Sequence, residues 1–439
     1  MPALNRLREL GVIERYHAVR HSVGMDACVA TSARYSTQDN TVLTSDLLFP
    51  ALRTLIEAHA MLGVRFDSRE DTLDVAYFRL ETVDLSRVVH FSRDRDLQAA
   101  LEKQLSRGFE DTQGDMPLWR LEVLIDNTII LALHHAIGDG LSSAVFHRSL
   151  LRALQETNPP TSSPSVHVPE LSLPPPIEHV TDIRPSLFTT LGVIYPNLLP
   201  ASWTSAYSAW TGNPIPTVAA LQTHVRLLRF EAADVKKFSE ICRSHKTSIT
   251  SAIYELSVCV ISRLLSNEPE KYKTITINLP ISLRQLAGAQ YDDVMGNYVS
   301  SSLTYPLLHP EFSWKLAARV AAELQVQKQK SREMLGLLSW VAPRFAAWMN
   351  GQLGQKRPYT LNISNLGRFQ DPVLDGKWAL CEMFFCQCDS VAGPAMCMNV
   401  AGDSTGGLGI SFTWGAGVDS AFLDAFVSMF RESFQNILT

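Results

Sequence analysis

The sequence predicts an α/β protein made of two halves, each with a mixed sheet and packed helices. The chain has 439 residues, of which 46% are hydrophobic and 19% charged, and this length is more than one hydrophobic core usually holds. Strand-like and helix-like apolar patterns alternate in both halves. Alternation of this kind is typical of sheets that are covered by helices.

The boundary between the halves is predicted from proline. Residues 158–176, NPPTSSPSVHVPELSLPPP, contain seven prolines, which hold a backbone extended and remove amide donors. We therefore predict a first domain over residues 1–176, a connecting segment over 177–223 and a second domain over 224–439. Aromatic residues indicate that the connecting segment is packed and not disordered. They are Trp203, Tyr207 and Trp210.

Apolar spacing predicts the elements of the first domain. We expect a strand at 26–35, a helix at 46–62, strands at 73–80 and 88–92, and helices at 96–109 and 141–157. A hairpin precedes the last helix, because strand patterns at 118–125 and 128–134 flank Asp126 and Asn127. This pair suits a two-residue turn.

The second domain is predicted to repeat the alternation with different lengths. We expect helices at 232–245, 249–265, 311–352 and 419–438, and strands at 224–230, 273–280, 297–305, 359–364, 378–388, 395–400 and 408–414. The 378–388 stretch, WALCEMFFCQC, holds three of the seven cysteines. It lacks a Cys-x-x-Cys pair and a nearby histidine, so we interpret it as a buried strand and predict no metal site.

Charge and hydropathy argue against several partner classes. The formal net charge is −5, so the chain offers no basic field for nucleic acid. Its apolar runs are far shorter than the roughly 18 residues that cross a bilayer, and its opening lacks the apolar core of a signal peptide. We predict a monomeric, cytoplasmic protein.

Residues 3–13, ALNRLRELGVI, predict an amphipathic helix that packs on its own domain. Peripheral membrane association through this helix is the alternative.

One short motif carries chemical information. In LALHHAIGDGLSS (131–143), His134 and His135 follow an apolar run, and Asp139 stands between Gly138 and Gly140. Successive residues of a strand face opposite sides, so only one histidine is expected to face a given cavity. Histidine accepts protons near neutral pH, and the glycines permit unusual backbone angles.

Two structural alternatives apply to this motif. The histidine and the aspartate can form structural hydrogen bonds that have no catalytic role. Asp139 can also pair with a cation and hold the loop instead of forming a dyad with the histidine. The sequence contains no Gly-x-Ser-x-Gly nucleophile elbow, so a route through an acyl-serine is not indicated.

The chain resembles the CoA-dependent acyltransferase superfamily, and within it the fungal alcohol O-acetyltransferases most closely. The blocks that carry the resemblance occur in the order expected for that superfamily. They are LIEAHAMLGVRF (55–66), MPLWRLEVLI (116–125), HHAIGDG (134–140), NLPISLR (278–284), MGNYVSS (295–301) and NISNLG (362–367). With the opening LRELGVIERYHAVRHSVGMDACV (7–29), the resemblance spans nearly the whole chain. The Asp-Phe-Gly-Trp-Gly motif of the plant BAHD enzymes is missing, which argues against that branch.

This resemblance implies a fold and a set of site residues. The fold is a pair of chloramphenicol-acetyltransferase-like α/β sandwich domains with an active-site tunnel between them. His135 corresponds to the family's general base, and Asp139, followed by Gly140, corresponds to the residue that braces the motif loop. An ion pair between Asp139 and Arg284 is therefore predicted across the domain interface. Contacts to the oxyanion or substrate are expected from residues for which a structural hydrogen bond is the alternative, namely Asn362, Ser364, Asn365 and Asn297.

On this basis we predict an O-acyltransferase that moves an acetyl group directly from acetyl-CoA to a hydroxyl of a hydrophobic small molecule, such as a secondary metabolite. No permanently bound cofactor is expected. One alternative is a condensation-like enzyme that takes its acyl group from a carrier protein and forms an amide or an ester. A second is a relative that binds a ligand without catalysis. A covalent route through Cys386 or Cys388 ranks last.

Overall fold

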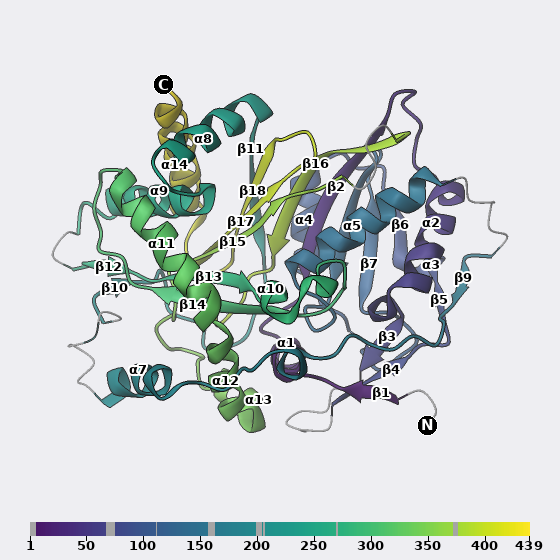
Figure 1. Ribbon diagram of the computed structural model, residues 1–439, viewed down its shortest axis with the longest axis horizontal. Coiled ribbons are helices and arrows are strands. Elements are labelled where there is room, and N and C mark those ends of the chain that lie inside the picture. Colours follow the sequence, from purple (N-terminus) through teal and green to yellow (C-terminus); the bar gives the residue numbers. More distant parts are fainter. Residues whose placement is uncertain are drawn as a thin grey trace.

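The computed structural model describes residues 6–66, 75–110, 112–156, 163–198, 204, 207–268, 271–371 and 376–439. Trp203 lies outside these residues. Figure 1 shows two lobes side by side, with the purple and blue part of the chain in one and the green and yellow part mainly in the other. Each lobe has a sheet with helices packed on it, so the predicted α/β class is confirmed.

The first lobe is built on a five-stranded mixed sheet in the order β16-β2-β8-β7-β6. Its strands are β2 (Val29–Thr37), β6 (Val89–Phe91), β7 (Trp119–Val123), β8 (Thr128–Leu133) and β16 (Trp378–Gln387). The predicted hairpin joins β7 to β8, and Asn127 in its turn has a φ of 64°. Asparagine tolerates this left-handed conformation better than most residues.

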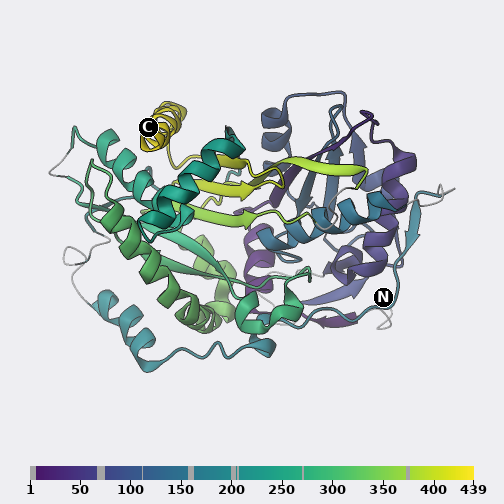
Figure 2. The same cartoon turned by 45° about the horizontal axis from the view of Figure 1, so that its top comes forward.

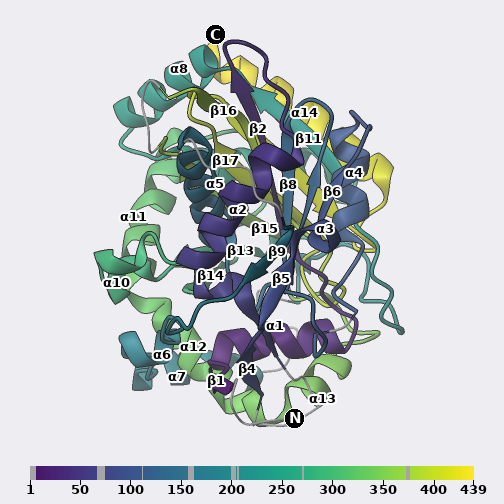
Figure 3. The same ribbon diagram turned by 90° about the vertical axis from the view of Figure 1, so that its right-hand side faces the viewer.

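Helices cover both faces of this sheet, as Figure 3 shows from the side of the first lobe. They are α2 (Ser45–Ala58), α4 (Leu97–Leu105) and α5 (Gly140–Gln155). On one face, Leu52 of α2 and Phe146 of α5 share a core with Leu131 of β8. On the other face, Leu101 of α4 clusters with Ala132. The central strands are therefore buried on both sides.

The second lobe contains a six-stranded mixed sheet in the order β11-β18-β17-β15-β13-β14. Its strands are β11 (His224–Phe230), β13 (Ile277–Ser282), β14 (Val299–Thr304), β15 (Leu361–Arg368), β17 (Met396–Gly402) and β18 (Leu408–Trp414). The helices of this lobe are α8 (Ala232–Ser244), α9 (Ile249–Leu264), α11 (Trp314–Lys330) and α14 (Ser420–Leu438), seen from another angle in Figure 2. Phe426, Phe430 and Phe434 recur at four-residue spacing and form the apolar face of α14.

One strand of the first lobe's sheet comes from the second half of the chain. β16 pairs antiparallel with β2, from Trp378 opposite Thr37 to Gln387 opposite Val29. The strand is buried as predicted, because its apolar residues face a core on each side. Residues 378–387 therefore tie the two lobes together. The domain boundaries at residues 176 and 223 stay a prediction.

The predicted helix over residues 3–13 is wrong. Its first three residues lie outside the described part, and β1 (Arg6–Glu9) is a strand that pairs with β4 (Ala76–Arg79). The helix, α1 (Val12–Ser22), begins later. The Glu14 carboxylate accepts a hydrogen bond of 2.7 Å from the Gly11 amide, so local capping and strand pairing, rather than leucine spacing, decide where the helix begins.

The remaining elements are short or connect the lobes. The strands are β3 (Val64–Phe66), β5 (Thr82–Asp84), β9 (Ser165–His167), β10 (Ala209–Trp210) and β12 (Thr274–Ile275). The helices are α3 (Leu85–Val88), α6 (Ile177–Val180), α7 (Leu187–Leu198), α10 (Arg284–Ala287), α12 (Arg332–Val341) and α13 (Phe345–Asn350). The helical stretch predicted at 311–352 thus divides into α11, α12 and α13.

Within the described residues, no helix combines the length and the apolar character that crossing a membrane requires. The predicted monomeric state and cytoplasmic location stay predictions.

Candidate active site

The motif identified in the sequence forms the turn between a central strand and a long helix. Residues 134–139 join β8 to α5. His134 packs among other rings, with its centroid 4.5 Å from that of His21 and 5.0 Å from that of Phe66. His135 instead lines a cavity. The prediction that the two histidines face different sides is confirmed.

His135 is held from two directions. Its ring stacks on the ring of His17 in α1, with 3.6 Å between centroids and 14° between planes. The side-chain amide of Asn297, which belongs to the second lobe, donates a hydrogen bond of 2.7 Å to the backbone carbonyl of His135. The orientation of this imidazole is therefore set by α1, and the position of its backbone by the opposite lobe.

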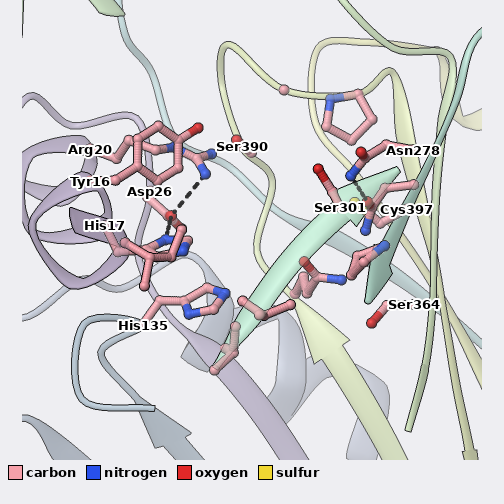
Figure 4. A pocket seen from close by; sticks show the side chains of 18 of the residues that line it. Tyr16, His17, Arg20, Asp26, His135, Asn278, Ser301, Ser364, Ser390 and Cys397 are labelled. Carbon is pink, nitrogen blue, oxygen red and sulfur yellow. Dashed lines mark hydrogen bonds and ion pairs between the residues drawn. The ribbon is translucent and has the colours of Figure 1, made fainter. Parts of the chain in front are cut away.

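A buried carboxylate lies behind the stacked histidines. Asp26 Oδ2 is 3.5 Å from His17 Nδ1 and 3.5 Å from Arg20 Nη1, as Figure 4 shows. The thiol of Cys388 donates to Asp26 Oδ1 at 2.8 Å. Burial disfavours the charge of Asp26, but Arg20 and His17 hold the pKa of this carboxyl well below its usual range. An ion pair of Asp26 and Arg20 is thus enclosed next to His135.

The surroundings favour the neutral form of the His135 imidazole. Burial lowers the pKa of His135, and the Arg20 charge acts in the same direction, whereas Asp26 and Asp139 act against them. Burial, together with His135, also lowers the pKa of His17 to about 3. A neutral imidazole has a free lone pair, so His135 can accept a proton at neutral pH.

The Asp139 carboxylate binds residues of the second lobe instead of the His135 ring. Its Oδ2 lies 2.5 Å from Arg284 Nη1 and accepts a 3.1 Å hydrogen bond from the Tyr298 amide. Its Oδ1 accepts hydrogen bonds from the amide and the hydroxyl of Ser142, so Asp139 also caps α5. The ion pair predicted between Asp139 and Arg284 is confirmed. Burial opposes the charge of Asp139, but Arg284 and the capping bonds keep its pKa below the ordinary value.

The glycines of the motif serve close packing. Neither Gly138 nor Gly140 has a positive φ, so the expectation of unusual backbone angles is wrong. A Cβ on Gly140 would lie 2.7 Å from a methyl carbon of Leu366 and 2.9 Å from the ring of Phe385. Because glycine has only a hydrogen atom as its side chain, α5 can pack closely against β15 and β16.

The cavity lined by His135 lies between the lobes and has a volume of about 370 Å³. Ligand sites of this kind usually measure about 300–1,000 Å³. Figure 4 shows the ring of His135 directed into this space from one wall, with Ser301 and Ser364 on the opposite wall. α12 and α13 contribute Leu338 and Trp348 to the lining, so apolar and polar surfaces meet there.

The polar residues predicted to contact the oxyanion or the substrate do not all lie in one cavity. Asn362 and Ser364 line the cavity that contains His135. Asn365 lines a second cavity on the other face of β15 and donates to Thr250 Oγ1 at 3.0 Å. Asn297 is absent from the cavity lining and binds the motif backbone. The two-residue period of a strand explains why Asn362 and Ser364 share a face that Asn365 leaves.

Sequence reasoning missed the contribution of α1 and of the segment that follows it. Tyr16, His17, Arg20 and Asp26 all line the cavity. The signal was present in ERYHAVRH (14–21), because residues three or four apart share a helix face. It was not used because the helix was placed too early in the chain.

The class of this site is decided by similarity to known proteins. Residues 88–434 match the family described as alcohol acetyltransferase. The chain belongs to this family. It is therefore an acyltransferase, as the resemblance of its motifs implied.

Relatives of this alcohol acetyltransferase occur in several fungi. An uncharacterized protein of Schizosaccharomyces pombe is 27% identical over 409 residues, which cover 88% of this chain and 87% of the relative. The probable alcohol acetyltransferase crmB of Aspergillus fumigatus is 24% identical over 461 residues, with 93% and 95% covered. The probable alcohol acetyltransferase FCK4 of Fusarium pseudograminearum is 22% identical over 389 residues, with 80% and 77% covered.

Solved structures show the fold of this family member. The trichothecene 15-O-acetyltransferase TRI3 of Fusarium sporotrichioides superposes with a TM-score of 0.71 at 13% identity, covering 98% of this chain and 94% of TRI3. The condensation domain of the Monacolin K polyketide synthase MokA gives 0.65 at 14% identity, with 98% and 97% covered. The predicted pair of chloramphenicol-acetyltransferase-like lobes is confirmed.

Proposed function

We propose that this alcohol acetyltransferase moves an acetyl group from acetyl-CoA to a hydroxyl of a hydrophobic small molecule, such as a secondary metabolite, with His135 as general base. The observation that carries the proposal is the imidazole of His135, which is oriented by its stack on His17 and directed into a cavity between two lobes. The ion pair of Asp26 and Arg20 supplies fixed charges on the same side of the cavity. The starter condensation domain of RzmA, a neighbour in fold, was solved with C8-CoA, which supports a CoA thioester as the donor.

The reaction proceeds in two steps. His135 takes the proton of the acceptor hydroxyl while its oxygen attacks the thioester carbonyl carbon, which gives a tetrahedral intermediate with one negative oxygen. The carbon–sulfur bond then breaks, and the departing thiolate takes the proton from His135. The products are the acetate ester and free CoA, and the histidine returns to its neutral form.

The tetrahedral intermediate needs hydrogen-bond donors that are already in place. The Ser364 hydroxyl is our proposed donor, because Figure 4 places it across the cavity from His135. Asn362 also lines the cavity and accepts a 2.7 Å hydrogen bond from Asn278, which fixes its amide group. Asn365 and Asn297 are not included, because both are engaged elsewhere.

The environment of the cysteines argues against a covalent intermediate. Burial raises the pKa of Cys386 to about 12 and that of Cys388 well above the ordinary value. The reactive form of cysteine is the thiolate, so both thiols stay protonated and unreactive. We therefore propose direct transfer of the acetyl group to the acceptor, with His135 carrying only the proton.

The decisive experiment compares His135→Ala with the parent protein, using acetyl-CoA and a panel of alcohols. We expect kcat/KM to fall by about 10²- to 10⁴-fold, the usual contribution of a general base, while the unfolding midpoint stays close to that of the parent. His59→Gln is the matched control, because His59 bonds Ser149 at 2.8 Å and does not line the cavity. Parent-like turnover in His135→Ala would refute the mechanism.

A condensation-like reaction is the second candidate. A segment of the nonribosomal peptide synthetase penN of Penicillium thymicola is 34% identical over 122 residues, which cover 26% of this chain and 4% of penN. Acetyl-CoA and an acetylated carrier protein should therefore be offered as competing donors, with alcohol and amine acceptors. Ester formation from acetyl-CoA alone supports the first candidate, whereas a requirement for the carrier supports the second.

A further inference from the structure

Three side chains of different chemical types meet in the second lobe, and none of them lines the cavity. Glu255 and Cys259 lie one turn apart on α9, and His309 lies between β14 and α11. One ligating atom from each of the three residues lies within 4.8 Å of the others. We propose that Glu255, Cys259 and His309 bind a zinc ion.

The three side chains are close enough to share one zinc ion. Glu255 Oε1 is 3.5 Å from His309 Nε2, and bonds of about 2.0 Å to nitrogen and oxygen place two ligands of a tetrahedral ion roughly 3.3 Å apart. Cys259 Sγ lies 3.6 Å from the other ring nitrogen, Nδ1, and within 4.8 Å of the other ligating atoms, so a small movement of its side chain completes the site. Thiolate, imidazole and carboxylate are also the three ligand types that zinc takes in proteins.

The hydrogen bonds around the cluster favour one assignment of the ligands. His309 Nδ1 lies 2.9 Å from the carbonyl oxygen of Glu311, and the Ser313 amide donates to Glu255 Oε1 at 3.2 Å. A histidine that binds a metal normally donates its other ring N–H to a carbonyl, and a ligating carboxylate is itself hydrogen-bonded. Both hydrogen-bond partners come from the segment at 309–313. We assign Nε2 of His309 as its ligand atom.

Two of the three ligands are enclosed by the second lobe. The Glu255 side chain is 3% exposed and Cys259 is fully enclosed. An ion bound there would be shielded from solvent by the protein and would stabilise the charged forms of both groups. His309 remains 27% exposed, which gives an ion a path and leaves a fourth position for water.

The test measures zinc binding by the full chain. Purified protein is freed of metal, dialysed against Zn²⁺ and assayed for bound zinc, and Co²⁺ is added to a second sample to detect the thiolate-to-cobalt absorption band. We expect one ion per chain and a rise in the unfolding temperature, since binding to the folded state stabilises it. Loss of even an outer hydrogen-bond partner weakens metal binding by about 10- to 100-fold, so Cys259→Ser and His309→Gln should each weaken it at least that much.

Matched controls separate this site from general effects. Cys242→Ser removes another buried thiol of the same lobe, and His90→Gln removes an exposed imidazole of the other lobe. Both should bind zinc and cobalt as the parent does. The proposal is overturned if Cys259→Ser, folded by circular dichroism, keeps the cobalt band or the parent affinity. It is equally overturned if the parent binds zinc no better than the variants do, which would leave an ion pair between Glu255 and His309 only.

Discussion

The carboxylate of Asp139 and the guanidinium of Arg284 form a buried ion pair that joins the two lobes at the motif. Their closest atoms are 2.5 Å apart, and the side chains are 5% and 2% exposed. Arg284 also donates to the Ser142 hydroxyl and to the Gly296 carbonyl. The aspartate of the motif therefore positions the loop that carries His135 and does not share a proton with it.

Removing one member of this pair leaves an unpaired buried charge. We expect Asp139→Ala and Arg284→Ala each to lower the free energy of unfolding by roughly 3–5 kcal/mol, and the double variant to lose much less than the sum. Urea denaturation of the four proteins measures this coupling. The pair Arg87 and Asp115 is a matched control, because it has the same 2.5 Å separation but is exposed, and surface pairs contribute at most about 1 kcal/mol. Additive losses at Asp139 and Arg284 would contradict the prediction.

The acid limb of the pH–rate profile should report His135. Because burial lowers its pKa, activity should persist below the ordinary titration range of histidine and fall as His135 becomes protonated. Asp26 raises this pKa and Arg20 lowers it. Asp26→Asn should therefore move the acid limb of kcat/KM to lower pH, and Arg20→Met should move it to higher pH. Shifts of the same sign in both variants would show that the limb belongs to another group.

Part of this site follows from the sequence because its determinants are local. The strand, turn and helix that carry HHAIGDG have clear apolar periods, and the partner of Asp139 was identified from the resemblance of NLPISLR (278–284). The stack of His17 on His135 was not predictable in the same way. It depends on the start of α1, which is set by the pairing of β1 and by the Glu14 cap, and not by the leucine spacing. The cluster of Glu255, Cys259 and His309 joins positions 50 residues apart, so no motif marks it.

Two buried histidines should make the protein sensitive to acid. Burial lowers the pKa of His17 and that of His147 to about 3, whereas both residues titrate near 6.5 in an unfolded chain. Between these two pKa values the unfolded state binds protons that the folded state does not. The stability contributed by the two neutral histidines is therefore fully present only above pH 6.5, and it decreases as the pH falls. The slope approaches about 1.4 kcal/mol per pH unit for each histidine.

His147→Gln tests this account, since glutamine can still bond Thr31 Oγ1, which lies 3.0 Å from His147 Nε2. Urea denaturation between about pH 5 and pH 8 should show a slope reduced by one histidine's share, even if the variant is less stable at every pH. An unchanged slope would mean that His147 becomes protonated in the folded protein.

Two neighbours on β15 provide a test of the proposed oxyanion contact. Ser364 faces the cavity with His135, whereas Asn365 faces the second cavity and bonds Thr250. Loss of one oxyanion donor usually lowers kcat by about 10²- to 10³-fold, so we expect Ser364→Ala to reduce kcat strongly with a smaller change in KM. Asn365→Ala should lower stability through the lost hydrogen bond but leave kcat near the parent value. Steady-state kinetics with acetyl-CoA measures kcat and KM of both variants. Equal losses of kcat in the two variants would contradict a specific contact of Ser364 with the oxyanion.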